Sequence, residues 1–548
     1  MESGTRSSPA RPGTECRVLE RIRVLAPVGF KAEMKALSKL AGPLIMAQLM
    51  SFSVSFVSTI FCGHLGKTEL AGVSLAIAVI NVTGISIGSG LSSACDTLIS
   101  QTFGGQNLLR VGAILQRAIL ILILACFPCW AILINTEPIL LAVRQDPEVA
   151  RLAQLYVKIF MPALPAAFMY SLQTRYLQNQ GIIWPQVITG CVVNILNALI
   201  NYIVLHALNL GVGGSAVANA ISQFSMAGIL YAYIMWRGLH KATWGGWSKE
   251  CLQDWGSYIH LAIPSMVMLC VEWWTYEIGG FLAGLISEVE LGAQSIVYEL
   301  ANVAYTFHLG FGIAGSVRVG NALGAGETEQ AKLSAKMTMF CAGSLSVCLA
   351  VLIGSLKDHI SYIFTYDEQI RRRVADVIAF YAPFILLDAI SVASGGIIRG
   401  AGKQKVGAVC NILGYYGVGF PIGVSLMFAA KLGIKGLWTG LFTCVSLQCL
   451  FLIFYLVRLN WNKVTVEAQI RAGVRGSSTD TSLQPDDPTN SQCQTDNVDL
   501  VGAEEGPTVK EELSHRTLVL RRGLTLAFML FILAAGIIIN LLITNLVR

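Results

Sequence analysis

The chain has 548 residues, of which 54% are hydrophobic and 13% are charged. A soluble globular protein usually carries about 25% charged residues. Here apolar stretches of about 20 residues, enough to cross a bilayer, recur along almost the whole length and leave little material for a soluble domain. The net charge of +6 is spread over the loops, which favours a role in membrane orientation over nucleic-acid binding.

Residues 1–34 are polar and arginine-rich, and we expect a cytoplasmic segment without a cleavable secretory signal. Six apolar runs follow within residues 35–236, and six more follow within residues 257–459, after a predicted cytoplasmic loop at 237–256. Each run predicts a transmembrane helix. The twelve predicted helices lie near 37–61, 72–99, 111–135, 152–174, 186–208, 213–236, 258–286, 291–317, 333–356, 374–398, 406–430 and 434–458.

The last part of the chain changes character. Residues 462–516 are rich in Asp, Glu, Thr and Gln and lack aromatic residues, so we expect a disordered cytoplasmic linker over 460–522. An apolar run at 523–546 then predicts a thirteenth transmembrane helix within residues 523–548. Lys and Arg are concentrated in alternate loops, which places the N-terminus in the cytoplasm and the C-terminus outside.

The two six-helix halves repeat each other. Leu-Ala-Gly-Pro at 40–43 matches Leu-Ala-Ile-Pro at 261–264, and the same offset of 221 maps Pro162 onto Pro383 and Gly181 onto Gly402. An even number of crossings per half starts both halves on the same side of the membrane. The predicted fold is therefore an all-α membrane protein of two six-helix bundles, related by a pseudo-twofold axis along the membrane normal, with an accessory C-terminal helix. Secondary transporters commonly use such repeats and bind substrate near the midplane between them.

Four carboxylates lie at membrane depth, and all are in the second half: Glu272, Glu277, Glu299 and Asp388. Each costs at least about 2.5–3.5 kcal/mol near the bilayer centre, so each needs a reason. An alternative is pairing with buried bases, but no Lys or Arg occupies the middle of an apolar run. Because desolvation disfavours the charged form, such acids would hold a proton until a cation replaced it.

Aromatic and amide side chains near these acids complete the candidate substrate cleft. Ring faces attract organic cations, and amides at membrane depth either line a cleft or join helices. His308 could relay protons or simply form a hydrogen bond. We predict no metal site and no cofactor, and interpret Cys126 and Cys129 as small packing residues. The candidate cleft residues are Trp273, Trp274, Tyr276, Tyr298, Tyr305, Gln48 and Asn81.

Two motifs carry a family resemblance. Gln101-Thr-Phe-Gly-Gly-Gln and Arg318-Val-Gly-Asn-Ala-Leu-Gly-Ala-Gly stand at matching places in the two halves, and together with Glu272 and Asp388 they resemble the MATE (multidrug and toxin extrusion) family over about residues 35–460. The linker and thirteenth helix resemble its vertebrate branch.

The resemblance implies proton-coupled export of organic cations, typically at the apical surface of kidney and liver epithelia. It also implies that the four carboxylates serve the cation and proton site, and that Cys62 faces the cleft. Many bacterial relatives carry an Asp in the first helix, where this chain has only Gln48 nearby, which shifts the expected chemistry onto the second half.

We therefore predict a secondary transporter rather than an enzyme. It is expected to exchange protons for organic cations by alternating access, to act as a monomer in the plasma membrane, and to have substrates, protons and the lipid bilayer as its partners. A sodium-coupled exporter of the same fold and a cation channel remain open alternatives. ATP hydrolysis is disfavoured, because the Gly-Lys pair at 402–403 lacks the earlier Walker glycine, where Ile397 stands.

Overall fold

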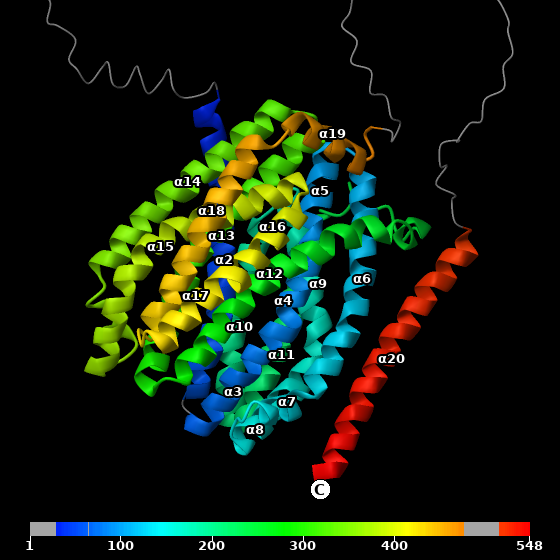
Figure 1. The fold of residues 1–548 in the computed structure, drawn as a ribbon. Helices are drawn as coiled ribbons and strands as arrows, with labels where there is room; N and C mark the ends of the chain where they lie inside the picture. The colour runs from blue at the N-terminus through cyan, green and yellow to red at the C-terminus, as the bar shows by residue number, and fades with distance from the viewer. Residues whose placement is uncertain (1–28, 64, 476–513, 548) are drawn as a thin grey trace, which may run out of the picture.

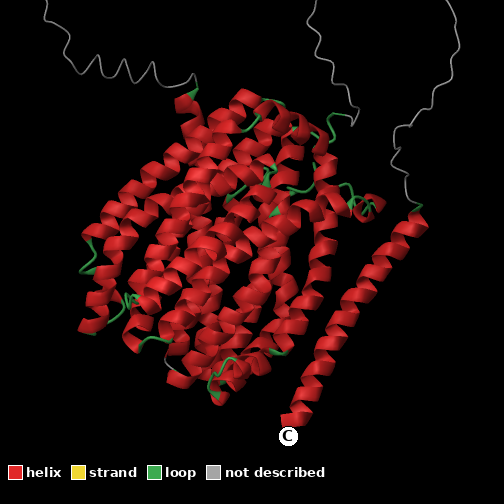
Figure 2. Cartoon of the chain, in the orientation of Figure 1, coloured by secondary structure: helices red, strands yellow, loops and turns green. Residues whose placement is uncertain are grey.

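The structure is a computed structural model that describes residues 29–63, 65–475 and 514–547. Long helices joined by short loops make up this part of the chain (Figure 2). Within a bilayer a helix satisfies all of its own backbone hydrogen bonds, which explains this architecture for so apolar a sequence. Two groups of helices form an N-lobe and a C-lobe (Figure 1).

The N-lobe follows the predicted order of six crossings. The second and fourth crossings are built from several consecutive helical pieces, including a π-helical turn η1 and a 3-10 turn η2. The elements are α2 (Phe30–Gly63); α3 (Lys67–Ile80), η1 (Asn81–Ile85), α4 (Ser86–Ser92) and α5 (Ala94–Gly104); α6 (Leu108–Ile134); the short α7 (Thr136–Ala142); α8 (Pro147–Phe160), η2 (Met161–Ala163) and α9 (Leu164–Gln178); α10 (Trp184–Tyr202) with η3 (Ile203–Ala207); and α11 (Gly211–Arg237).

The C-lobe follows after the short turn η4 (Lys249–Leu252) and again has six crossings. Its fifth crossing contains two π-helical stretches, η6 and η7. The elements are α12 (Trp255–Gly284); α13 (Glu288–Gly324); α14 (Thr328–Ser355) and the turn η5 (Ile360–Ile363); α15 (Glu368–Ala401); α16 (Gln404–Asn411), η6 (Ile412–Gly419), α17 (Phe420–Val424) and η7 (Ser425–Ala429); and α18 (Ile434–Arg458).

Eleven membrane-length helices in the described chain are apolar enough to be candidate spans. Twelve crossings and a C-terminal helix were expected, and the two that fall outside this set are α12 and α13, with 30 and 37 residues. Both are long enough to cross a bilayer. Both carry carboxylates and tyrosines that interrupt their apolar stretches, and these two helices hold most of the candidate site.

The predicted linker is wrong at its beginning. Trp461–Arg471 form a helix, α19, whose N-cap Asn460 accepts a hydrogen bond from the backbone N–H of Lys463. Val464 and Ala468 on its inner face are fully buried and pack against Ile397 and Val319 of the C-lobe. Polar composition concealed this amphipathic helix. Residues 476–513 of the predicted linker lie outside the described residues.

The C-terminal helix α20 (His515–Val547) begins eight residues before the run expected at 523. It lies beside α6 at the edge of the N-lobe (Figure 1). Asn135 and Asn540 bind backbone carbonyl oxygens across this contact, and a Cβ at Gly536 would press on Ala131. Most of its surface is exposed, as expected for an accessory helix that faces lipid.

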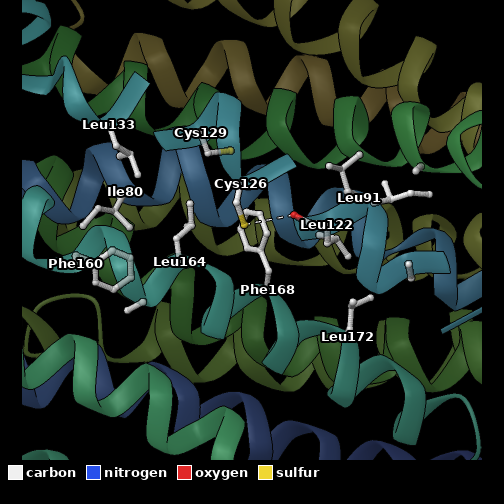
Figure 3. Packing of buried hydrophobic residues seen from close by; sticks show 14 of the residues in the cluster. Ile80, Leu91, Leu122, Cys126, Cys129, Leu133, Phe160, Leu164, Phe168 and Leu172 are labelled. Atoms are coloured by element: carbon white, nitrogen blue, oxygen red, sulfur yellow. Dashed lines mark hydrogen bonds between the residues drawn. The ribbon is translucent and has the colours of Figure 1, made fainter. Parts of the chain in front are cut away.

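The N-lobe core is a continuous apolar cluster between α4, α6, α8 and α9 (Figure 3). Phe168 of α9 fills the space beside Gly88 of α4, where a Cβ would collide with its ring. Cys126 and Cys129 are buried in this cluster, and the thiol of Cys126 donates to the carbonyl oxygen of Leu122 at 3.4 Å (Figure 3). Both cysteines thus lie among packing residues.

The two lobes meet where α5 crosses α13, close to α19 at the upper end in Figure 1. A Cβ at Gly104 would collide with the carbonyl oxygen of Asn321, and one at Gly324 with that of Gln101. These glycines belong to the two motifs noted in the sequence. Their lack of a side chain therefore permits a close approach of backbones between the lobes.

Polar contacts surround this crossing. Thr97 and Gln101 of α5 donate side-chain hydrogen bonds to the carbonyl oxygens of Arg399 and Gly400, the second at 2.9 Å. Arg471 of α19 donates to the Gln101 side chain at 3.2 Å, and Asn107 donates to the carbonyl oxygen of Ala472 at 3.0 Å. We refer to this region as the α19 end. The lobes are joined there.

A buried carboxylate adds a further link at the α19 end. Glu33 of α2 accepts two hydrogen bonds from Arg318 of α13, at 3.0 and 2.5 Å. It also accepts from Gln330 at 2.5 Å and from Ser334 at 2.6 Å, both on α14. One N-lobe side chain thus holds two C-lobe helices. At the opposite end, α3, α7 and α8 pack mainly on elements of their own lobe.

Candidate cation and proton site

The candidate site lies on the face of the C-lobe formed by α12, α13 and α15. Glu272 and Glu277 come from α12, Glu299 from α13, and Asp388 from α15. Asp388 is 6% exposed, whereas the three glutamates are half-buried. Partial exposure at these positions is what a carboxylate needs in order to exchange a bound proton or cation.

The first cluster is built around Asp388. The Nδ1 atom of His308 lies 3.2 Å from one of its carboxylate oxygens, and His308 is completely buried. Glu272 lies close enough to Asp388 to interact with it electrostatically, and Tyr305 lies close to both carboxylates and to Trp273. Three helices therefore bring two carboxylates, an imidazole and a phenol into one polar group, which we call the Asp388 cluster.

A second group of polar side chains lies nearer the C-terminal end of α12. Glu277 is five residues beyond Glu272, about 7.5 Å further along the helix axis. Its side chain lies close to Tyr298 and interacts electrostatically with Glu299. This group, the Glu277 cluster, is thus separate from the Asp388 cluster, in keeping with the different directions that a spacing of five residues gives to two helical side chains.

Aromatic rings connect the two clusters. The ring of Tyr276 lies 6.0 Å from that of Tyr298 and 6.3 Å from that of Trp438, measured between centroids. Trp438 also packs edge-on against Tyr381 and Phe384, at 5.3 and 5.5 Å. Its indole N–H donates to Gln294 at 2.8 Å, which fixes the ring. A cation beside Tyr276 would meet π faces as well as carboxylates.

No Lys or Arg nitrogen lies within 4.0 Å of any of the four carboxylates, as far as the structure describes the chain; Asp388 has only His308. Arg318, which lies on α13 like Glu299, is bound to Glu33. Arg399 interacts with Glu272 only at longer range. The alternative of buried ion pairing thus finds no support in the geometry, and the acids are available to bind mobile cations.

The remaining residues of the predicted cleft lie outside the two carboxylate clusters. Trp274 of α12 donates from its indole nitrogen to the carbonyl oxygen of Val82 at 3.1 Å, so it crosses from one lobe to the other. Asn81 precedes Val82 at the start of η1 and is half-buried, as is Gln48 of α2. Trp274 and Asn81 therefore stand at the boundary between the lobes.

Cys62 is placed elsewhere. It is completely buried in the N-lobe core, and its sulfur lies 2.8 Å from the hydroxyl of Ser215 on α11. The cleft position expected for it does not occur in this conformation. Because Cys62 is buried and its Sγ faces Ser215 of α11, the side chain contributes to packing rather than to a cleft surface.

Sequence reasoning missed some members of the site. Trp438 and Tyr381 appeared as ordinary apolar positions, since nothing in their spacing distinguishes them from core residues. His308 was noted without a partner. Its distance of 80 residues from Asp388 concealed the pairing. Asp96 of α5, a further buried carboxylate, is bound by Arg175 at 2.5 Å within the N-lobe.

Comparison with known proteins identifies the family. The MatE family matches two stretches of the chain, residues 43–203 and 264–425, which together exceed half its length. The stretches begin 221 residues apart, the offset of the internal repeat. The chain belongs to the MATE family. Each lobe of this MATE transporter thus contains one copy of the family unit, and the resemblance carried by the two glycine motifs is confirmed.

Full-length relatives agree with this assignment. The MATE protein described here is 62% identical over 556 residues to multidrug and toxin extrusion protein 1 of Danio rerio, covering 97% of this chain and 94% of the relative. It is 51% identical to the human protein of the same name, covering 98% of this chain and 99% of the relative. The predicted membership of the vertebrate branch is therefore confirmed.

A solved structure supports the fold of this MATE transporter. The crystal structure of the eukaryotic MATE transporter AtDTX14 superimposes with a TM-score of 0.78 at 27% identity, covering 81% of this chain and all of that one. The predicted fold class, an all-helical membrane protein of two lobes, is thus confirmed.

Proposed function

We propose that this protein is a proton-coupled antiporter that exports organic cations by alternating access. The observation that carries the proposal is the group of membrane-depth carboxylates, Glu272, Glu277, Glu299 and Asp388, without a Lys or Arg partner among the described residues. Uncompensated acids in low dielectric favour the neutral, protonated form, so they exchange a proton for another positive species. The relatives named multidrug and toxin extrusion protein support cationic drugs and toxins as the cargo.

The two lobes, residues 35–236 and 257–459, are the moving parts in this proposal. The joined α19 end supports a conformation that is closed on that side. With the N-terminus in the cytoplasm, this conformation is outward-facing. The Asp388 cluster takes up a proton from outside, the lobes rearrange, and a cytosolic cation replaces the proton before the return. One positive charge moves in each direction, so the exchange is electroneutral.

The role of each candidate residue follows from its place. Glu272 and Asp388 exchange the proton for the cation, and His308 holds Asp388 in position. Glu277 and Glu299 attract cations nearer the open side. Trp273, Trp274, Tyr276, Tyr298 and Tyr305 supply ring faces, and Gln48 and Asn81 line the N-lobe side of the cleft.

The experiment is uptake of tetraethylammonium into vesicles that contain the purified protein, driven by an imposed pH gradient. Glu272→Gln and Asp388→Asn should abolish this uptake, because an amide cannot exchange a proton. Glu329→Gln is the matched control, since that glutamate is exposed at the surface of α14. Normal uptake by Glu272→Gln at equal protein amount would refute the assignment.

Two further arms separate the alternatives. Replacing sodium by potassium at a fixed pH gradient leaves uptake unchanged for a proton exchanger and abolishes it for a sodium exchanger. Preloading the vesicles with unlabelled substrate accelerates uptake by an exchanger, whereas a channel shows no such counterflow. Lack of counterflow would therefore overturn the proposal of alternating access.

The cellular setting is also part of the proposal. We place the protein in the plasma membrane, at the apical face of epithelia, as a functional monomer with its C-terminus outside. An epitope attached after Arg548 should be reached by antibody in intact cells. Staining only after permeabilisation would contradict the orientation.

A further inference from the structure

A cavity lies at the α19 end, and none of the four carboxylates lines it. It has a volume of about 750 Å³ and is lined by the start of α12 and by parts of α6, α16 and α19. Six cationic side chains line it, against the two carboxylates Asp254 and Glu467. We call it the basic pocket. Its cations are Arg110, Arg117, Lys403, Lys405, Arg471 and Arg475.

Most of this positive charge is not neutralised inside the protein. Glu467 binds Lys403 at 2.8 Å and also reaches Arg471 at 3.5 Å. Asp254 accepts a hydrogen bond from Ser257 and forms no ion pair with a described residue. Arg110, Arg117, Lys405 and Arg475 are likewise without a carboxylate partner in the described ranges. Six cations thus share one cavity with two carboxylates, and Arg117 interacts with Asp254 only at longer range. This excess of positive charge concentrates anions.

Arg117 gives the strongest indication of a ligand. The residue is 8% exposed, and its Nε atom has no hydrogen-bond partner among the described residues. Its one hydrogen bond to protein is weak, from a terminal nitrogen to the carbonyl oxygen of Glu250 at 3.3 Å. Burying an arginine with unused donors is unfavourable unless something binds them. The planar fork of a guanidinium suits a phosphate, which accepts two hydrogen bonds from it at once.

We propose that the basic pocket binds an anion with more than one phosphate group. The size of the cavity and the spread of the cations over α6, α16, α19 and the residues next to them both favour an anion larger than a single phosphate. Such an anion could be the headgroup of a phosphoinositide in the adjacent leaflet or a soluble polyphosphate, and both present the same chemistry to the pocket.

Binding would act on the conformation of the transporter. The pocket takes Arg117 from the N-lobe, Lys405 from the C-lobe, and Arg475 from the segment just after α19. An anion that bridges these three parts binds the conformation closed at the α19 end better than one in which they separate, and it shifts the population accordingly. The binding does not depend on cation exchange, but this regulatory effect rests on the proposed function.

The binding test uses the purified full chain with two probes. Inorganic tripolyphosphate is added to protein in nonionic detergent, and nanodiscs of phosphatidylcholine are compared with and without phosphatidylinositol 4,5-bisphosphate. Affinity and thermal unfolding are measured in each. We expect the bound anion to raise the unfolding temperature and added salt to weaken binding. A response to tripolyphosphate identifies a soluble source, and a response only to the lipid identifies a headgroup.

Variants at the rim keep the test independent of folding. Lys405→Gln and Arg475→Gln change exposed side chains, and each should weaken binding about tenfold by removing a charge-assisted contact. Arg117→Gln should abolish it. Lys463→Gln is the matched control, because Lys463 is exposed on α19 and does not line the pocket. Equal binding by the control and the two rim variants, or no response to either probe, would overturn the proposal.

The regulatory effect has its own measurement. Saturating tripolyphosphate on the α19 side should slow counterflow of tetraethylammonium in the wild-type protein but not in the double variant Lys405→Gln/Arg475→Gln. If the anion binds and counterflow is unchanged, the binding site is supported, but the proposed effect of the anion on the conformation of the transporter is refuted. If counterflow is absent without any anion, the proposed transport function fails instead, while the binding result is unaffected.

Discussion

The Nδ1 atom of His308 and a carboxylate oxygen of Asp388 lie 3.2 Å apart between α13 and α15, where both residues are buried. The other ring nitrogen of His308 has no partner among the described residues. Among the described residues, the imidazole therefore has Asp388 as its one hydrogen-bond partner. We propose that His308 is a positioning residue for the Asp388 cluster.

Replacing His308 by Leu removes this contact with little change in volume. We expect proton-driven uptake to fall about tenfold, the lower end of the effect of losing a hydrogen bond to a charged group. Its dependence on pH should change as well, which a purely structural role would not cause. His308→Gln retains an amide donor and should recover part of the activity. The control is His206→Gln, because His206 is exposed at the far end of the N-lobe. An unchanged pH profile in His308→Leu would contradict the positioning role.

Replacing Glu33 by Gln should destabilise the joined conformation. The carboxylate is 3% exposed and accepts from Arg318, Gln330 and Ser334, so the amide loses charge-assisted bonds to two helices. We expect a loss of about 1.5–3 kcal/mol in the free energy of unfolding, measured by denaturation in detergent. Glu329→Gln should cost less than about 0.5 kcal/mol, since its ion pair is exposed. Equal effects of the two changes would refute the special role of Glu33.

Replacing Gly324 by Ala tests the backbone contact between the lobes. The new Cβ would collide with the carbonyl oxygen of Gln101, at a cost of about 1–3 kcal/mol for overpacking. Because the collision exists only when the α19 end is closed, counterflow should slow by about tenfold or more. Gly343→Ala is the control, since nothing lies within 4 Å of its added Cβ, and it should stabilise α14 by about 0.5–1 kcal/mol. Normal counterflow in Gly324→Ala would rule out a tight crossing.

Replacing Trp438 by Phe should weaken the aromatic support under Tyr276. The indole N–H bonds to Gln294, which is buried, and its loss leaves the amide unsatisfied. We expect the free energy of unfolding, measured by thermal denaturation, to fall by about 1–3 kcal/mol. The double variant Trp438→Phe/Gln294→Leu removes both polar partners and should recover much of this loss. A double variant less stable than Trp438→Phe would show that the hydrogen bond is not the cause.

The crossings and the acidic residues could be predicted from sequence, because length, hydropathy and charge are local properties. Glu272 and Asp388 were recognised since any acid in an apolar run is costly. Their grouping was not predictable from spacing, because it depends on how α12, α13 and α15 pack. Lys and Arg are absent from the centre of the predicted helices, and for this reason the expectation of unpaired acids agrees with the structure.

The misses have physical causes as well. In α19 the polar face dominates the composition, and only Val464, Ala468 and their neighbours reveal an inner face once the lobes are present. Glu33 lies near the start of the first helix, where an acid is common. Its partners lie almost 300 residues away. Cys62 was expected in a cleft from family resemblance alone, and the packing of α2 against α11 gives it a different environment.

The hydrogen bonds from Thr97 and Gln101 end on the carbonyl oxygens of Arg399 and Gly400. A main-chain oxygen is present whichever amino acid occupies its position. These two hydrogen bonds therefore require no particular side chain at positions 399 and 400. At this contact the specific side chains thus come from α5, whereas the separate link through Glu33 of α2 depends on side chains of both lobes. Side chains in the facing stretch of α15 can change without loss of these two hydrogen bonds. Gly400 is an exception, because an added Cβ would collide with the carbonyl oxygen of Ser316. The two halves of the internal repeat can therefore differ in sequence and still pack against each other at this contact.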